Sequence, residues 1–319
     1  MFDSLLNPPV LFFFLGLFAT SVRSDLHIPE AVSKLLSMYL LLSIGFRGGV
    51  ELSHSGVTLA VAEYLGAALL LAIVTPLWVF FAMRAWLGAI NGAAVAATYG
   101  SVSAITFIAA VAFLDKSGEA YGGYAVAALA LMESPAIVIG VLLARCFQRE
   151  NSGGVPWKSL LHDACLNGSV LLLLGSFIIG LTTGSTHWKS LEPFVSGNFS
   201  GLLAFFLLDM GLLAGRHMGE LCRVGLPALL GAVVVPLVNA SVAIGLAGWG
   251  GFSVGDALLL TTLAASASYI AVPAALRLAL PEANAGVYLP MALALTFPFN
   301  VVVGIPLYHT IIRALWNTT

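Results

Sequence analysis

Long apolar runs, separated by short clusters of charge, glycine and proline, divide the chain into ten hydrophobic segments. About 20 apolar residues are enough for a helix to cross a bilayer, so this pattern predicts ten transmembrane helices. The first run follows an acidic residue, Asp3, and many others follow it, so we interpret it as a membrane helix and not as a signal peptide. The predicted spans are 4–22, 31–50, 56–83, 87–114, 120–145, 165–183, 197–215, 224–247, 256–277 and 284–312.

The polar segment 148–163 lies near the middle of the chain and separates two halves, 1–147 and 164–319, of five spans each. Landmarks of the first half recur in the second at an offset of 164 to 166 residues: 129–131 with 293–295, Gly140 with Gly304, Ser101 and Ser103 with Ser266 and Ser268, and Gly45 and Gly49 with Gly211 and Gly215. Five is odd, so the second half must enter the membrane from the opposite side. The pattern therefore predicts an all-α integral membrane protein of ten transmembrane helices in two inverted five-helix repeats, as in many secondary transporters.

Two small, hydroxyl-rich stretches interrupt otherwise apolar spans, at 96–106 in the fourth and at 264–273 in the ninth. A helix that breaks at such a place exposes backbone N–H groups and a positive dipole end, which attract an anion. Tight helix packing is the alternative interpretation of either stretch alone. Because the stretch recurs in both halves, we favour a solute site. Its predicted anion-binding residues are Thr98, Tyr99, Gly100, Ser101, Ser103, Ala265, Ser266, Ala267 and Ser268.

Glu133 lies midway along the fifth predicted span, next to Pro135. An acid at that depth costs about 2.5–3.5 kcal/mol on insertion scales, so we expect it to face a cavity or the protein interior. It is either a ligand of a coupling cation or a protonated structural acid. Hydroxyls and free carbonyls are hard oxygen ligands that suit Na⁺. The predicted sodium-binding and coupling residues are Glu133, Thr106, Thr262, Ser268 and Tyr269, with Thr296, Pro298 and Asn300 completing the cavity.

Three other charges fall inside predicted spans. Glu63 is expected at an interface or a subunit contact. Asp209 is either a gate residue or an interhelical hydrogen-bond partner. Arg47 either attracts anions to the outer mouth or extends its side chain to the membrane surface.

Composition limits the class of protein, since 60% of the residues are hydrophobic and only 9% are charged. Soluble domains carry about 25% charged residues, so this is an integral membrane protein. The formal net charge of −2 speaks against a nucleic-acid partner. The sequence shows no nucleophile triad, phosphate loop or metal-ligand cysteine spacing, so we expect no enzyme activity, no cofactor, and no metal other than Na⁺.

Lysine and arginine predict the orientation. Nine of them lie in the connectors after spans 1, 3, 5, 7 and 9, and four lie on the other side. The richer side is expected to be cytoplasmic. Both termini would then lie outside, with the connector 148–163 in the cytoplasm.

Several motifs, in order along nearly the whole chain, resemble the sodium-dependent bicarbonate transporter family of cyanobacteria and its wider bacterial relatives. They are Gly48-Gly49, Gly100-Ser101-Val102-Ser103 with Thr106, Met132-Glu133-Ser134-Pro135-Ala136, Gly219-Glu220-Leu221-Cys222-Arg223, Ala264-Ala265-Ser266-Ala267-Ser268 and Pro281-Glu282-Ala283-Asn284-Ala285. The chain departs from the cyanobacterial pattern at Tyr269, where those members carry an acid, and over 271–274. The central connector is also short.

The resemblance implies a core domain of spans 3–5 and 8–10, a gate domain of spans 1, 2, 6 and 7, and crossed discontinuous helices 4 and 9. It also implies a homotrimer in the bacterial inner membrane, surrounded by lipid, with a PII-like cytoplasmic regulator in some members. The predicted function is Na⁺-coupled symport of bicarbonate or a similar small anion. The alternatives are a Na⁺- or H⁺-coupled organic-anion symporter, resembling bile-acid transporters, and, from another class, a passive anion channel or a solute sensor.

Overall fold

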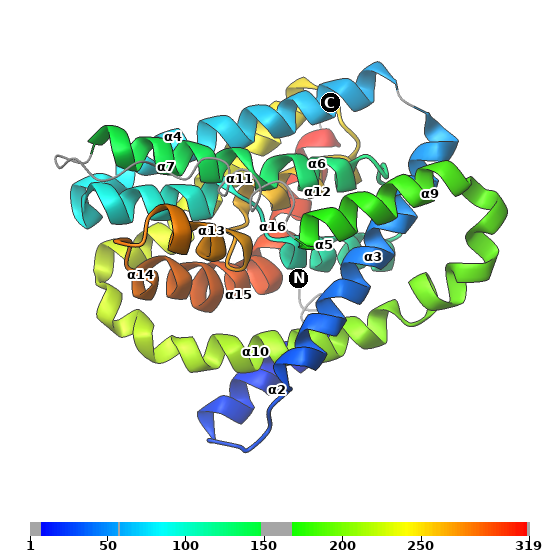
Figure 1. The fold of residues 1–319 in the computed structure, drawn as a ribbon. Helices are drawn as coiled ribbons and strands as arrows, with labels where there is room; N and C mark the ends of the chain where they lie inside the picture. Colours follow the sequence, from blue (N-terminus) through cyan, green and yellow to red (C-terminus); the bar gives the residue numbers. More distant parts are fainter. Residues whose placement is uncertain (1–7, 57, 148–167, 318–319) are drawn as a thin grey trace.

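The computed structural model describes residues 8–56, 58–147 and 168–317, which form helices and contain no β-strand (Figure 1). The predicted connector 148–163 lies outside these described residues. The helices of the first half are α2 (Pro8–Ser21), α3 (Glu30–Ser55), α4 (Leu59–Gly100), α5 (Ala104–Ser117), α6 (Ala125–Glu133) and α7 (Pro135–Phe147). The second half holds α9 (Gly168–Glu192), η1 (Pro193–Gly197), α10 (Phe199–Val224), α11 (Leu226–Trp249), α12 (Val254–Ala265), α13 (Ala271–Ala279), α14 (Ala285–Pro290), η2 (Met291–Thr296), α15 (Phe297–Phe299), η3 (Asn300–Gly304) and α16 (Ile305–Trp316).

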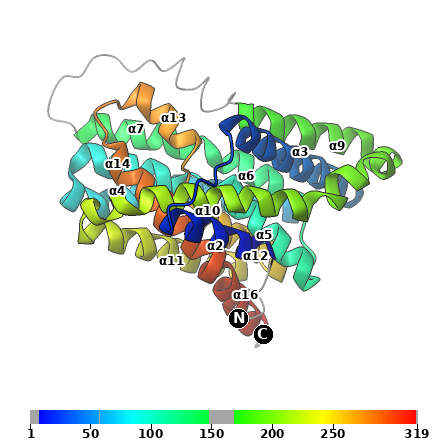
Figure 2. The ribbon, with the colours of Figure 1, turned by 90° about the horizontal axis from the view of Figure 1, so that it is seen from below.

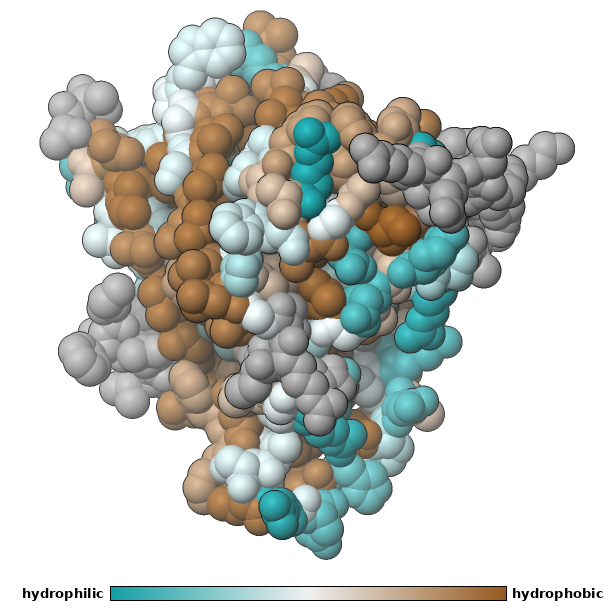
Figure 3. All heavy atoms as spheres, turned by 90° about the vertical axis from the view of Figure 1, so that its left-hand side faces the viewer, coloured by the Kyte–Doolittle hydropathy of each residue, from teal (hydrophilic) through white to brown (hydrophobic). Residues whose placement is uncertain are grey.

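Six helical stretches among the described residues are long and apolar enough to cross a membrane. They are Glu30–His54, Leu59–Ser117, Ala125–Phe147, Phe199–Gly219, Leu226–Trp249 and Ala285–Trp316. Many large apolar side chains on them are exposed, and Figure 3 shows hydrophobic residues over much of one face, with most of the hydrophilic ones gathered along its right-hand side. Such a surface suits lipid and not water. The chain is therefore a multi-pass helical membrane protein, while its arrangement as ten spans stays a prediction.

The stretch 59–117 reverses direction within α4, at Gly88 (Figure 1). Gly88 has φ 78° and ψ 171°, a conformation that residues with a side chain rarely adopt. After the turn the chain packs back on itself, because a Cβ on Gly92 would lie 2.9 Å from the Cα of Arg84. The predicted boundary between the third and fourth spans, near residue 85, thus corresponds to a hairpin turn without a polar loop.

Four helices form two tightly packed pairs, α3 with α9 and α2 with α10 (Figure 2). A Cβ on Gly49 would lie 2.0 Å from the carbonyl oxygen of Phe177, and one on Gly180 would lie 2.2 Å from that of Phe46. In the other pair, a Cβ on Gly211 would lie 2.1 Å from the carbonyl oxygen of Phe13. Glycine lets these helix backbones touch, as small residues do at membrane helix interfaces.

The remaining helices pack mainly on one another, with α4 against α6 and α7 and α12 against α11 and α16. We call this group, α4–α7 with α11–α16, the α12 bundle, and we call α2, α3, α9 and α10 the α3 bundle. The two bundles meet through α10 with α14 and η2, through α6 with α9, and through α3 with α5 and α6.

The turns between successive helices gather at two opposite ends of the molecule. At the first, the Arg313 end, Trp316 Nε1 donates to the Phe252 carbonyl over 2.7 Å, and Arg313 Nε lies 3.3 Å from Glu119 Oε1. At the second, the Arg84 end, the guanidinium carbon of Arg84 lies 4.7 Å from the Phe147 ring centroid. A chain that crosses back and forth through a membrane produces this arrangement.

We expect Gly211→Ala to destabilise the protein and Gly201→Ala, on the same helix, to leave it intact. The Cβ at 211 meets backbone that cannot move aside, whereas a Cβ at 201 has nothing within 4 Å. Overpacking costs about 1–3 kcal/mol, while alanine replacing an exposed helical glycine gains up to ~1 kcal/mol. Thermal unfolding in detergent measures both variants. Equal melting temperatures would show that α2 and α10 can separate without cost.

Candidate functional site

Two interrupted helices meet at their breaks in the centre of the molecule. The first break separates α4 from α5 at residues 101–103, where Ser101 (φ −86°, ψ 174°) and Ser103 (φ −107°, ψ 110°) are extended. The second break separates α12 from α13 at 266–270, where Ser266 is extended at φ −81° and ψ 170°. Two hydrogen bonds join them: Ser103 N–H donates to Ser266 Oγ over 2.9 Å, and Ser268 N–H donates to the Thr98 carbonyl over 2.9 Å. The two polar stretches of the sequence therefore lie side by side.

Serine hydroxyls explain why each helix can restart after its break. Ser103 is the N-cap of α5, and its Oγ accepts a hydrogen bond from the Thr106 N–H over 3.2 Å. Ser268 Oγ accepts from the Val272 N–H over 3.4 Å near the start of α13. A capping hydroxyl satisfies one of the unpaired N–H groups of a helix N-terminus, which stabilises the new helix.

The first break is also tied to the junction between α6 and α7. Ser101 Oγ donates to the backbone carbonyl of Glu133 over 2.9 Å. At that junction α6 ends at Glu133 and α7 begins at Pro135, which lacks the N–H needed to continue the helix. Close packing is possible because Gly100 has no side chain; a Cβ there would lie 2.9 Å from the Cβ of Ala136, in the first turn of α7.

The second break is supported by residues of the last span. Asn300 Nδ2 donates to the carbonyl of Ala265, the last residue of α12, over 2.8 Å, and Tyr308 in turn donates to Asn300 Oδ1 over 3.0 Å. Thr296 Oγ1 donates to the Ala232 carbonyl over 2.7 Å, which leaves Tyr99 as the donor in its 2.7 Å bond to Thr296. These residues hold the breaks in place and do not line the cavity described below. Sequence reasoning missed Tyr308, which lies in the first turn of α16. The two π-helical segments before it, η2 and η3, are of a kind that is frequent at functional sites.

A cavity of about 1370 Å³ lies between the α3 bundle and the two breaks. At one extreme it reaches Glu30, Lys34, Arg216 and His217, near the first turns of α3 and the last turns of α10. At the other it is lined by Val102–Ile105, Glu133 and Ser268–Ala271, that is, by the breaks themselves. Its remaining wall is largely apolar, with Met38, Leu41, Phe46, Phe206, Met210 and Leu293 among the lining residues.

The predicted anion-binding residues divide into two sets. Ser103 and Ser268 line the cavity. The others, Thr98, Tyr99, Gly100, Ser101, Ala265, Ser266 and Ala267, are buried behind this lining and shape the breaks. Their hydroxyls are largely occupied, as Ser266 Oγ donates to the Leu263 carbonyl over 2.8 Å and Thr98 Oγ1 to the Ala94 carbonyl over 2.8 Å.

The predicted sodium residues divide in the same way. Glu133, Ser268 and Tyr269 line the cavity, while Thr106 and Thr262 are buried in its surroundings. The hydroxyls of Thr261 and Thr262 are fully buried and have no hydrogen-bond partner among the described residues. Oxygen groups of this kind fit Na⁺. Tyr269 stands where the resemblance implies an acid in cyanobacterial members. Its ring packs on Phe297 with centroids 5.6 Å apart, and its hydroxyl lies 3.8 Å from Met210 Sδ.

Asp209 makes an interhelical hydrogen bond, one of the two roles that the sequence left open, and the gate role stays a prediction. Ser33 on α3 donates a hydrogen bond to its carboxylate, so it joins two helices, and it also lines the cavity. Glu63, by contrast, is exposed on α4. One buried acid was overlooked: Asp256, in the first turn of α12, accepts hydrogen bonds from the Gly122 N–H and the Tyr124 hydroxyl, each over 2.7 Å. It lies at the end of a span, where an acid draws no attention in the sequence.

Interrupted helices that meet beside a cavity in a multi-pass helical protein are typical of membrane transporters. A family model of the Na⁺-dependent bicarbonate transporter superfamily matches residues 8–313, nearly the whole chain. The chain therefore belongs to the Na⁺-dependent bicarbonate transporter superfamily. No curated protein matches it. Membership confirms the family resemblance and the class, a secondary transporter and not an enzyme, and it implies coupling to Na⁺ and bicarbonate as the substrate.

Proposed function

We propose that this protein is a Na⁺-coupled symporter that takes up bicarbonate or a similar small anion, bound where the two breaks meet. The observation that supports this most directly is the pair of hydrogen bonds between Ser103 and Ser266 and between Ser268 and Thr98. They hold two polar breaks together at the inner end of a cavity in a membrane protein. Irregular backbone at membrane depth is tolerated where it lines such a cavity.

Two features of the breaks would attract the anion and the cation to the same place. The first turn of α5, including Ala104 and Ile105, lines the cavity, and a helix N-terminus carries a partial positive charge that stabilises anions. Glu133 and Ser268 line the cavity too and present oxygen atoms to a cation. Binding of either ion then favours the other through their opposite charges, which is the basis of symport.

The packing of the helices supports the two inverted repeats. Under the predicted repeat, α2 is equivalent to α9 and α3 is equivalent to α10. If each helix of the glycine-mediated pair α3–α9 is replaced by its equivalent, the result is the pair α10–α2. This is the other glycine-mediated pair in the structure. On this basis we propose repeats at 1–147 and 164–319, with the α12 bundle as the core domain and the α3 bundle as the gate domain.

We further propose that the Arg84 end faces the cytoplasm and that both termini lie on the other side, in the inner membrane of a bacterium. The excess of lysine and arginine in the connectors assigned to the Arg84 side supports this orientation. The homotrimer and a PII-like regulator at the cytoplasmic face remain proposals carried by the family resemblance.

The size of the cavity favours a second candidate, an organic-anion symporter. A volume of about 1370 Å³ with a largely apolar wall exceeds what a bicarbonate ion needs, and it is larger than the roughly 300–1,000 Å³ of typical pockets for organic ligands. In a bicarbonate carrier the same space is a water-filled vestibule that leads to the breaks. The two candidates differ in which molecules compete for the site.

A competition panel on Na⁺-driven uptake into proteoliposomes distinguishes the two. We expect excess unlabelled bicarbonate to suppress uptake of labelled bicarbonate, and a bile acid at the same concentration to leave it unchanged. Suppression by the bile acid, together with Na⁺-driven uptake of the bile acid itself, would establish the organic-anion function instead. Ion currents far above carrier turnover would show a channel, and binding without flux would show a sensor.

A further inference from the structure

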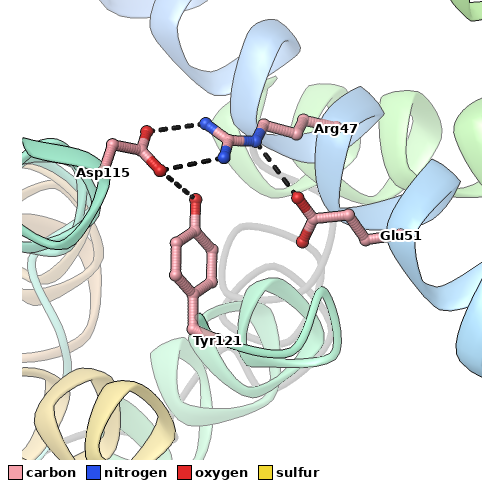
Figure 4. A network of polar contacts seen from close by, with 4 residues as sticks. All are labelled: Arg47, Glu51, Asp115 and Tyr121. Carbon is pink, nitrogen blue, oxygen red and sulfur yellow. Dashed lines mark hydrogen bonds and ion pairs between the residues drawn. The ribbon is translucent and has the colours of Figure 1, made fainter. Parts of the chain in front are cut away.

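An ion pair joins the two bundles near the Arg313 end of the molecule (Figure 4). Arg47 on α3 donates from Nη1 to Asp115 Oδ2 over 2.6 Å and from Nη2 to Asp115 Oδ1 over 2.8 Å, and Asp115 lies in the last turn of α5. The two parallel bonds fix the relative position of the helices, as this geometry does for arginine and a carboxylate. Arg47 was expected to attract anions or to reach the membrane surface; the structure pairs it across the bundle interface instead.

Two neighbours hold this pair in place (Figure 4). Glu51, one turn further along α3, accepts from Arg47 Nε over 3.2 Å, and the Tyr121 hydroxyl donates to Asp115 Oδ1 over 3.2 Å. The Arg47 and Asp115 side chains are only 31% and 34% exposed, which limits screening by solvent and salt.

Backbone contact accompanies the ion pair. A Cβ on Gly123, just before α6, would lie 2.1 Å from the carbonyl oxygen of Gly48, and one on Gly48 would lie 3.0 Å from the carbonyl oxygen of Gly123. Here α3 of one bundle therefore touches the other bundle with no side chain between them. Any movement that separates the bundles at this end must break this contact and the Arg47–Asp115 pair together.

A small cavity of about 140 Å³ lies beside the ion pair and shares no lining residue with the large one. Arg47, Asp115 and Ser43 line it, and the Ser43 side chain is buried. The two cavities are thus separate: the large one extends from the breaks to Glu30 and Lys34, whereas the small one lies beside the ion pair.

We propose that Arg47 and Asp115 form an ionic gate, which holds the Arg313 end closed while the solute site is open to the Arg84 end. During transport the α3 and α12 bundles separate at Arg47 and Asp115, and the small cavity beside Ser43 widens into the second access path. The proposal rests on the transport function proposed above, because a carrier must expose its site to the two sides in turn.

Cysteine accessibility tests the gate without measuring transport. In a background with Cys146, Cys165 and Cys222 replaced by serine, Ser43→Cys places a nearly isosteric reporter beside the ion pair. The purified protein in lipid nanodiscs exposes both ends to a water-soluble maleimide, so membrane orientation does not affect the result. We expect Asp115→Asn to raise the labelling rate of this reporter by about fivefold. This factor corresponds to the loss of ~1 kcal/mol, the upper end of what a surface ion pair contributes. Arg313→Gln, which breaks the ion pair to Glu119 within the α12 bundle, should leave it unchanged.

A second reporter shows whether the whole transporter switches. Ser37 lines the large cavity. The labelling rate of Ser37→Cys should therefore fall when Asp115→Asn raises the labelling rate of Ser43→Cys. Arg47→Gln combined with Asp115→Asn should open the gate no further than either change alone, because both remove the same interaction. Should Asp115→Asn reduce the melting temperature, Gly123→Ala provides an independent test, since its Cβ wedges the gate open and leaves the charges in place.

Three outcomes would overturn the gate. The first is an unchanged labelling rate of Ser43→Cys in both Asp115→Asn and Gly123→Ala. The second is additive effects on that rate in the double variant, and the third is a higher rate at Ser43→Cys with a constant rate at Ser37→Cys. The last would mean local loosening only. None of these outcomes depends on which anion is carried. A protein that fails to take up bicarbonate and still shows reciprocal labelling would keep the gate and lose the proposed substrate.

Discussion

Replacing Ser266 by leucine is expected to reduce anion uptake by at least about 100-fold, equivalent to ~2.7 kcal/mol. Ser266 Oγ is buried between the two breaks, where it accepts a hydrogen bond from the Ser103 N–H and donates one to the Leu263 carbonyl. Leucine leaves the Ser103 N–H unsatisfied, which costs about 1–3 kcal/mol, and overfills the space, which costs a similar amount. Both costs fall on the geometry that forms the site.

The matched control is Ser241→Leu, the same substitution at an exposed position on α11. Its hydroxyl donates to the Leu237 carbonyl of its own helix over 2.8 Å and forms no contact with either break, so we expect normal uptake. Uptake into proteoliposomes measures both variants, and elution as a single folded species confirms that each can be compared with the wild type. Equal uptake by Ser266→Leu and Ser241→Leu would place the solute site elsewhere.

The second large effect is expected for Glu133→Gln, which should abolish the stimulation of uptake by a Na⁺ gradient. Glutamine has nearly the same shape but no negative charge to stabilise the cation in the cavity that Glu133 lines. The backbone carbonyl at 133, which accepts from Ser101, is unchanged, so the first break should keep its geometry. We expect the ratio of uptake with and without the gradient to fall to about one.

Glu63→Gln is the control for this charge change. Glu63 is also an acid within a predicted span, but it is exposed on α4 and does not line the cavity. Its variant should keep the full response to Na⁺. If Glu133→Gln responds to Na⁺ as Glu63→Gln does, then Glu133 is a structural acid, which is the alternative that the sequence left open.

Local sequence signals predicted much of this structure because their physical causes are local. Apolar runs predicted the membrane helices, and the serines at 101–103 and 266–268 predicted the breaks, since each needs only nearby hydroxyls as caps. The directions of the hydroxyls were not predictable. Ser101 was expected to face the anion, but its hydroxyl bonds to the Glu133 carbonyl of another helix, a contact that depends on how the helices pack.

Features that depend on distant packing could not be inferred from the sequence. The pairing of Arg47 with Asp115 joins residues 68 positions apart, and nothing near either residue indicates its partner. The width of the large cavity likewise follows from the distance between two bundles and not from any one helix. The volume of about 1370 Å³ beside the breaks is therefore a property of the assembled fold.

Uptake of labelled bicarbonate into proteoliposomes, with an inward Na⁺ gradient and with K⁺ in its place, tests the central claim most directly. A symporter that binds anion and cation together at the two breaks should accumulate bicarbonate only with the Na⁺ gradient, and dissipating the gradient should release it. Equal uptake under both conditions would contradict Na⁺ coupling and, with it, the role proposed for the cavity beside Ser103, Glu133 and Ser268.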